Sequence, residues 1–190
     1  MKRLAFVAFA AVALTGCAYN AQTVNLAPTI DVTGSTVGSG ISVQVSVIDD
    51  RASKSLGRRG GGYGPAAEIT AEGDIAAVVR ERVTSGLQRK GFSVGQQPGA
   101  SGPRLEVQIR LLDYGTSTGF WTGGVQIQST LKAEASNGGE SFEKLYRSDR
   151  EERVAVVPAA EKNAEWLNRA LSESLNEMLN DAELMAFLAK

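Results

Sequence analysis

The residue with the most distinctive side-chain chemistry in this sequence is Cys17, the only cysteine among 190 residues. A single cysteine excludes an intramolecular disulfide. The sequence also contains no histidine, which excludes the Ser-His-Asp and Cys-His nucleophile systems and every metal site that uses imidazole. The role of Cys17 must therefore be read from the residues that precede it.

Residues 1–16 have the parts of an export signal. Lys2 and Arg3 form a positive n-region, and residues 4–13 are an unbroken apolar run. This run is shorter than the ~20 residues of a membrane-spanning helix, but it fits an h-region. Thr15 and Gly16 then lead directly into Cys17, a sequence that resembles the lipobox of bacterial lipoproteins. The alternative is an ordinary signal followed by an incidental cysteine, but the three parts have the spacing of a lipobox.

A lipobox implies that the signal is removed before Cys17 and that the thiol and the new amine are acylated. We expect a diacylglyceryl group and a palmitate-type chain there, and no other cofactor. Each buried methylene contributes ~0.8 kcal/mol, so two or more chains anchor a protein stably to a membrane surface. Residues 17–23 form a tether with a reach of about 20 Å. Since Ala18, and not Asp, follows the cysteine, the analogy with enteric-type bacteria places the protein at the periplasmic face of the outer membrane.

The charge of the mature chain excludes one class of partner. Loss of Lys2 and Arg3 with the signal leaves a net charge of −3, with basic and acidic residues interspersed. Affinity for nucleic acids comes mostly from Lys and Arg that neutralise phosphates. We therefore expect no nucleic-acid binding.

Hydrophobic periodicity predicts a single α+β domain over residues 24–190, in the order β-β-α-β-β-β-α. Two amphipathic helices are expected on one face of a mostly antiparallel sheet. The first strand, Val24–Val32, is placed at an edge because Pro28 cannot donate a hydrogen bond. A flexible loop is expected over residues 52–65. The other expected elements are strands 41–48, 105–111, 125–133 and 142–157, helix 71–90 ended by Gly91, helix 161–179, and a short last helix capped by Asn180 or Asp181.

Several of these stretches together resemble the YajG-type family of uncharacterised bacterial lipoproteins, and the similarity extends over nearly the whole chain. To our knowledge the family has no assigned reaction, cofactor or partner, so the resemblance implies no catalytic residues. The chain departs from the family pattern in a long Gly/Arg loop at 57–64 and around residues 151–160. The segments that carry the resemblance are Cys17-Ala18, residues 24–30, the strand 41–48 with Asp50-Arg51, residues 89–95, residues 105–109, Tyr146-Arg147, and Phe187-Leu188 at the end of the chain.

Two groups of basic residues are candidates for partner contact. Arg51 follows Asp49 and Asp50 at the end of a strand. The three residues could form a recognition cluster there, or a local turn in which Asp bonds nearby backbone amides and Arg pairs locally. Adjacent aspartates on a strand face opposite ways, so they are not a paired acid-base site. Arg58 and Arg59 lie in the Gly-rich segment, which lacks a phosphate-binding G-x-x-x-x-G-K-[ST] motif; they could contact anionic lipid or belong to a solvated linker.

Three aromatic residues, Tyr114, Phe120 and Trp121, flank a hairpin rich in Gly, Thr and Ser. Aromatic side chains at an exposed tip often anchor a partner, but they could equally cover one end of the core. By contrast, Trp166, Leu171, Met178 and Phe187 have the spacing of a core-facing helical stripe.

These features predict a membrane-anchored lipoprotein of the cell envelope that is not an enzyme and binds or scaffolds an envelope protein or peptidoglycan. One alternative is a regulator of a peptidoglycan synthase, which the short tether disfavours. A second is a lipid- or glycan-processing enzyme, which the missing histidine and the lack of a convergent carboxylate pair disfavour. No metal site is expected.

The hairpin gives a first testable prediction. In a Trp166→Phe variant, the remaining fluorescence comes from Trp121, and iodide should quench it strongly if that side chain is exposed for binding. An emission that iodide does not quench would contradict a contact role for Trp121.

Overall fold

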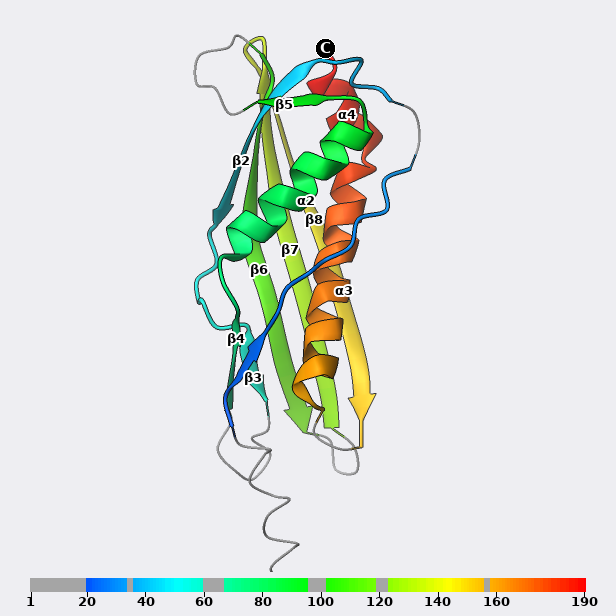
Figure 1. Cartoon of the computed structure of the whole chain (residues 1–190). Helices are drawn as coiled ribbons and strands as arrows, with labels where there is room; N and C mark the ends of the chain where they lie inside the picture. The colour runs from blue at the N-terminus through cyan, green and yellow to red at the C-terminus, as the bar shows by residue number, and fades with distance from the viewer. Residues whose placement is uncertain (1–19, 34–35, 60–66, 96–101, 119–122, 156–157) are drawn as a thin grey trace, which may run out of the picture.

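The computed structural model describes residues 20–33, 36–59, 67–95, 102–118, 123–155 and 158–190, with the side chains of residues 117 and 118 left aside. Their strands form one sheet covered on one face by helices (Figure 1). No helix within these ranges is long and apolar enough to cross a membrane. The strands are β1 (Gln22–Val24), β2 (Ser42–Asp49), β3 (Gly57–Arg59), β4 (Ala67–Ala71), β5 (Ser93–Gly95), β6 (Arg104–Thr118), β7 (Gly123–Asn137) and β8 (Glu140–Val154), and the helices are α2 (Ile75–Arg89), α3 (Ala160–Leu179) and α4 (Ala182–Leu188).

Strand β6 organises the sheet because it has partners on both sides. On one side it pairs antiparallel with β7, which pairs antiparallel with β8. On the other side its first half pairs parallel with β2, whose outer neighbour is β5, and its second half contacts β3, followed by β4 and β1. The three long strands therefore form a continuous antiparallel core, and two short groups of strands complete it.

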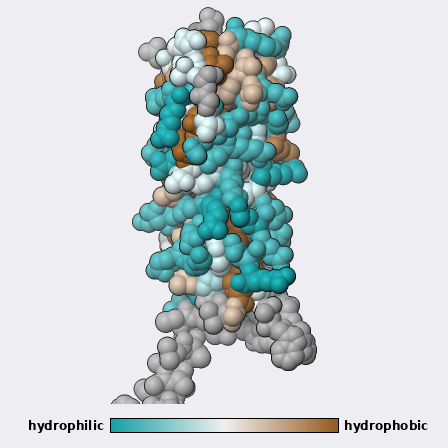
Figure 2. Space-filling model, turned by 90° about the vertical axis from the view of Figure 1, so that its right-hand side faces the viewer, coloured by the Kyte–Doolittle hydropathy of each residue, from teal (hydrophilic) through white to brown (hydrophobic). Residues whose placement is uncertain are grey.

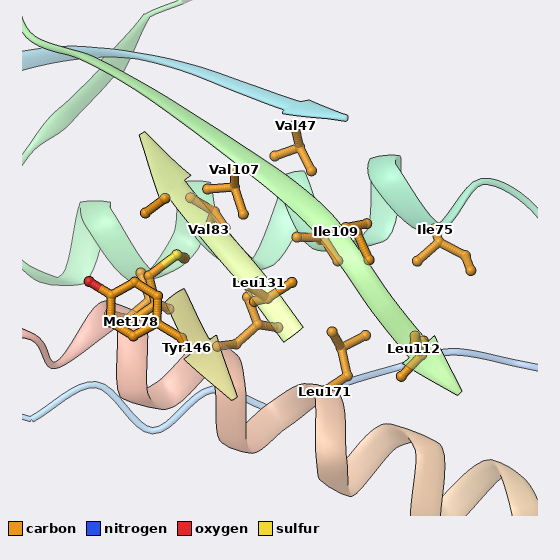
Figure 3. Close-up of a cluster of buried hydrophobic side chains, with 14 of the residues drawn as sticks. Val47, Ile75, Val83, Val107, Ile109, Leu112, Leu131, Tyr146, Leu171 and Met178 are labelled. Atoms are coloured by element: carbon orange, nitrogen blue, oxygen red, sulfur yellow. The ribbon is translucent and has the colours of Figure 1, made fainter. Parts of the chain in front are cut away.

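Helices α2 and α3 pack on the same face of the sheet, as the sequence predicts. Val83 of α2, Leu171 and Met178 of α3, and Val107 and Ile109 of β6 are all fully buried and meet between the layers (Figure 3). The expected C-terminal stripe is confirmed as core, with Trp166 and Phe187 only 6% and 7% exposed. Gly86 lets the two helices approach, because a Cβ at that position would lie 2.5 Å from the Leu179 side chain.

The predicted chain reversals are confirmed. Helix α2 begins at Asp74, whose Oδ1 accepts from Ala76 N at 2.9 Å, and it ends at Lys90, just before Gly91. Asp181, not Asn180, caps α4, accepting from Glu183 N. Between β7 and β8, Gly138 and Gly139 both have positive φ, the conformation of a two-residue hairpin turn.

The predicted sheet is wrong in two respects. The sheet is mixed and not mostly antiparallel: β1–β4, β2–β5, β2–β6 and β3–β6 are parallel pairs. The order β-β-α-β-β-β-α also omits β3, which lies inside the expected loop, and β4, which lies between that loop and the expected helix and pairs antiparallel with β3. The helix expected from residue 71 begins at Ile75, because Ala71 is the last residue of β4. The hydrophobic periodicity of a strand shows which face of the sheet each side chain occupies, but it does not show which strand is its neighbour. A strand of three residues is also too short for its alternation to be detected.

A bulge in β6 also changes which residues face the core. The register slips by one residue between Ile109 and Leu111, so the inward side chains switch from odd to even positions. Leu112 is consequently 1% exposed, whereas the alternation in the sequence predicted Leu111 at that place.

The expected edge strand Val24–Val32 is replaced by a different arrangement. β1 ends at Val24, and the following segment lies along α3. Backbone N–H groups of Ala27, Thr29, Asp31 and Thr33 donate to side-chain oxygens of α3 and of its C-cap at 2.7–2.8 Å. The acceptors, spaced four residues apart, are Asn168, Ser172, Asn176 and Asn180.

The spacing of this polar ladder explains why it forms. Two extended residues advance ~6.6 Å and four helical residues ~6.0 Å, so every second amide meets every fourth side chain. Leu26 and Pro28, at the intervening positions, are buried. Pro28 has no N–H to donate, and the ladder requires none there. The predicted alternation is confirmed, but the partner is a helix and not a strand.

The ladder predicts a local effect of mutation. Asn176→Ala removes the acceptor of the Asp31 amide, so that amide should exchange with solvent about tenfold faster, the equivalent of one lost hydrogen bond. Hydrogen exchange measured by NMR tests this. Gln88→Ala, which removes an exposed amide side chain from α2, is the matched control; equal acceleration in both variants would contradict the ladder.

Candidate functional site

The register of the strands shows from which end the chain enters the sheet. One cross-strand row joins Gln22 of β1 to Ile69, Gly57, Tyr114 and Ile127. β1 is parallel to β4, β4 is antiparallel to β3, and β3 is parallel to β6. The chain before β1 therefore comes from the end at which β6 finishes and β7 begins, the lower end in Figure 1. We call this the β1 end.

The predicted lipid-attachment residue lies close to this end in the sequence. Cys17 lies outside the described residues, but only five residue steps separate it from Gln22. An extended chain of that length spans at most about 18 Å. The sheet begins inside the segment expected to be a tether, so the free part of that tether is shorter than residues 17–23.

The predicted contact residues do not form one exposed patch. Tyr114 is 1% exposed and belongs to the core, so its side chain covers one end of the core, which was the alternative interpretation. Arg59 is also buried, whereas Arg58 is exposed. Phe120 and Trp121 lie outside the described residues, in the connection between Thr118 and Gly123, which pair with each other. Of the predicted contacts at the β1 end, the structure describes only Arg58 as exposed.

The Asp49–Arg51 pair is a local turn interaction. Arg51 Nε and Nη2 donate to the two carboxylate oxygens of Asp49 at 2.8 and 3.0 Å, and Lys54 adds a third contact at 2.9 Å. The hydrogen bonds from Arg51 lower the pKa of Asp49 to about 2, against an opposing effect of burial. Asp50 instead faces Arg110 of β6. Arg51 is buried and paired, which matches the turn interpretation and not a recognition cluster.

A buried polar cluster closes the core at the β1 end. Its members are Gln22, Arg59, Tyr114 and Asn163, of which none is more than 9% exposed. The amide of Gln22 is best satisfied when its oxygen accepts from Ala160 N, at 3.3 Å, and from Arg59, and its nitrogen faces the Asn163 amide. Among the described residues, the hydroxyl of Tyr114 and Nε of Arg59 have no hydrogen-bond partner. This cluster joins β1, β3, β6 and the start of α3.

A groove of about 590 Å³ lies at the opposite end of the sheet, where β5, β2, β6, β7 and β8 come together. Polar side chains from four strands line it, among them Arg104, Ser136 and Ser141. Glu106, Glu134 and Glu143 occupy neighbouring positions in one cross-strand row. We call this the distal groove.

The carboxylates of the distal groove are already engaged. Gln108 Nε2 donates to Glu106 and Glu134 at 3.0 and 3.1 Å, and Lys132 Nζ lies 3.0 Å from Glu143 and contacts Glu134 as well. Lys132 and Gln108 together lower the pKa of Glu134. Carboxylates paired in this way suit recognition by hydrogen bonding. Within the described ranges, no three potential ligands are grouped to hold a metal ion.

Neither the buried cluster nor the distal groove could be predicted from the sequence. Both depend on residues from strands far apart in the sequence, and their partners follow from topology and not from local pattern. An inward-facing Arg59 could have been suspected from the alternation of Gly57, Arg58 and Arg59, had these three residues been recognised as a strand.

The side formed by β8 and α3 is mostly hydrophilic (Figure 2). Among the described strands, β8 pairs with β7 alone. Ion pairs connect β8 to the helices: Arg150 to Glu173, Glu152 to Arg169, and Lys144 to Asp181 at 2.9 Å. Charged side chains on an edge strand discourage pairing with another chain. We therefore do not assign the β8 edge as a binding site.

Comparison with known proteins gives a family match. The model of a family described as "uncharacterized lipoprotein" matches residues 28–189. No curated protein matches the chain.

Comparison with solved structures indicates a shared fold in one case. A protein from Xanthomonas campestris is 13% identical, with a TM-score of 0.54, and the alignment covers 85% of this chain and 96% of that one; at this identity the likeness concerns the fold alone. A minor lipoprotein from Acinetobacter baumannii is 5% identical, with a TM-score of 0.43, and the alignment covers 78% of this chain and 90% of that one.

The Asp49–Arg51 pair predicts a pH dependence of stability. The pKa of Asp49 in the folded protein, about 2, lies below its ordinary value of 3.8. The pair therefore stabilises the fold above pH ~4 and loses this contribution as the pH falls toward 2, by about 2 kcal/mol. Urea unfolding at pH 7, 4, 3 and 2 should show this loss in the native chain and a smaller one in Arg51→Gln. Arg58→Gln, which removes an exposed arginine, should behave like the native chain; identical pH profiles for native and Arg51→Gln would refute the assignment.

Proposed function

The chain belongs to the uncharacterised lipoprotein family whose model matches residues 28–189, and from this we propose a lipid-anchored, non-catalytic binding module of the cell envelope. The lipid is carried by Cys17. The domain stands with its β1 end toward the membrane and displays the distal groove to a partner.

The observation that carries this proposal is the direction in which the chain enters the sheet. Cys17 is at most about 18 Å from Gln22, and Gln22 lies in the same row as Tyr114. β6 continues four residues past this row to Thr118, about 13 Å farther toward the same end. The connection that contains Phe120 and Trp121 therefore leaves the sheet on the side of the lipid.

If the β1 end faces the membrane, the predicted contact residues Phe120, Trp121 and Arg58 belong to the end of the domain that is nearest the lipid. Trp favours the interface between membrane and water, and Arg is attracted to anionic lipid. We propose that Phe120 and Trp121 touch the bilayer surface beside the lipid anchor. Exposed Arg58, on β3, would add an electrostatic contact at the same end.

The distal groove lies on the other side of the molecule from the anchor. Along β7, nine residues separate Ile127 in the Gln22 row from Ser136 in the groove, a distance of about 30 Å. A partner held there would be an envelope protein or peptidoglycan. The paired state of Glu106, Glu134 and Glu143 supports binding and not catalysis, because proton transfer requires a carboxylate free to change its charge.

The lipid anchor is tested by Cys17→Ser. The variant should leave washed membranes and lose metabolic palmitate labelling, because its N-terminal region can no longer be acylated. The native chain, fractionated in parallel, should be labelled and membrane-bound. Equal amounts of both forms in washed membranes, or an unlabelled native chain, would end the proposal.

The choice of membrane has its own test. We propose the outer membrane because Ala18 follows the lipidated cysteine. In an enteric-type host, Ala18→Asp should move the protein to inner-membrane fractions on a sucrose gradient, whereas Ala18→Ser should leave its position unchanged. A native protein that already sediments with the inner membrane would contradict this part of the proposal.

A further inference from the structure

Arg59 is a buried cation without a counter-charge. Its side chain lies in the core at the β1 end, and the residue is 6% exposed. Every Asp and Glu of the chain lies within the described ranges, and none of the ion pairs there includes Arg59. Burial of an unpaired charge is costly. The burial of Arg59 therefore opposes folding unless another group compensates its charge.

The start of α3 is directed at the same point. This helix has 20 residues, its N-cap is Ala159, and no side chain of that residue satisfies the first turn. The free N–H groups and the helix dipole make such an end partly positive. Ala160 N and Arg59 Nη1 both converge on the amide oxygen of Gln22. A neutral oxygen thus occupies the position where two positive groups meet.

Tyr114 adds a third donor. Its hydroxyl is buried and has no partner. Burial raises the pKa of Tyr114 to about 12, although the nearby Arg59 lowers it. The hydroxyl therefore keeps its proton at neutral pH and can donate.

We propose that this cluster is an anion site for a phosphate group, in which a phosphate oxygen replaces the amide oxygen of Gln22. Arg59 would bind two phosphate oxygens through its planar donor pair, as guanidinium groups do. The first turn of α3 would supply backbone N–H groups, as at other phosphate-binding helix ends. The hydroxyl of Tyr114 would complete the set.

The phosphate could belong to a phospholipid headgroup or to free inorganic phosphate. The headgroup source rests on the proposed function, which places the β1 end at the membrane. Gln22 is the first residue of β1 and only five residues from Cys17 in the sequence. The side chain that a phosphate oxygen would displace is therefore close to the proposed anchor. A lipid bound there would hold the domain upright on the bilayer.

Thermal unfolding of the full-length lipidated chain in a maltoside detergent tests the site. At matched ionic strength, inorganic phosphate should raise the Tm by about 3 °C relative to chloride, the shift expected near tenfold saturation of one site. Dioctanoyl phosphatidylglycerol is compared with dioctanoylglycerol, which has the same chains without phosphate. A response to the lipid alone assigns a headgroup site, and a response to inorganic phosphate assigns a site for the free anion as well.

Two variants make the test specific. Gln22→Glu places a carboxylate beside Arg59, so its Tm should exceed that of the native chain and should no longer respond to phosphate. Arg147→Gln, a change at an exposed arginine of β8 that has no role in the proposed site, should keep the full response. Gln22→Glu does not depend on the folding of an Arg59 variant.

The proposal is overturned if neither phosphate source shifts the native Tm, or if Gln22→Glu responds as strongly as the native chain. Its failure is distinguishable from a failure of the proposed function. The response to inorganic phosphate does not require anchoring, and the fractionation of Cys17→Ser does not require a phosphate site.

Discussion

The burial of one face of β6 under α2 and α3 is the constraint on which the rest of this structure depends. β6 contributes Leu105, Val107, Ile109, Leu112 and Tyr114 to the core, and it is the strand against which both halves of the sheet align. Burial of large aliphatic side chains is the main favourable term in folding. Because β6 is paired on both sides, its register also determines where β1 enters and where the distal groove opens. The β1 end and the distal groove are thus both consequences of the register of one strand.

The two ends of the domain differ in chemistry. At the distal groove every acidic side chain in the central row, Glu106, Glu134 and Glu143, has a basic or amide partner. The negative charges of this row are therefore compensated within the protein. At the β1 end a guanidinium and a hydroxyl are withdrawn from water without full compensation. Unsatisfied buried polar groups cost stability, and they are often found where a ligand completes the set. The polar core therefore lies at the end where the lipid anchor is proposed.

The sequence predicted the elements better than their arrangement. The apolar stripes of α2 and α3, the Gly138-Gly139 turn, the end of α2 before Gly91 and the Asp181 cap of α4 follow local rules, and the structure confirms them. The parallel pairing of β2 with β6 could not be predicted, since both strands show the same alternation whatever their neighbour. The bulge at residue 110 shifted the inward set by one position, which no periodicity analysis detects. Among the predicted contacts, Arg51, Arg59 and Tyr114 are buried because burial depends on the tertiary neighbours that cover a residue and not on its type.

The polar ladder between residues 27–33 and α3 also has a consequence for the order of events during folding. Its hydrogen bonds join groups that are 141–147 residues apart in the chain. The amides of residues 27–33 have no helix to bind until α3, which follows all the strands in the sequence, has formed. Contacts of such long range form late. We therefore expect the segment after β1 to pack last, and its hydrogen bonds then join the first strand of the sheet to the last long helix.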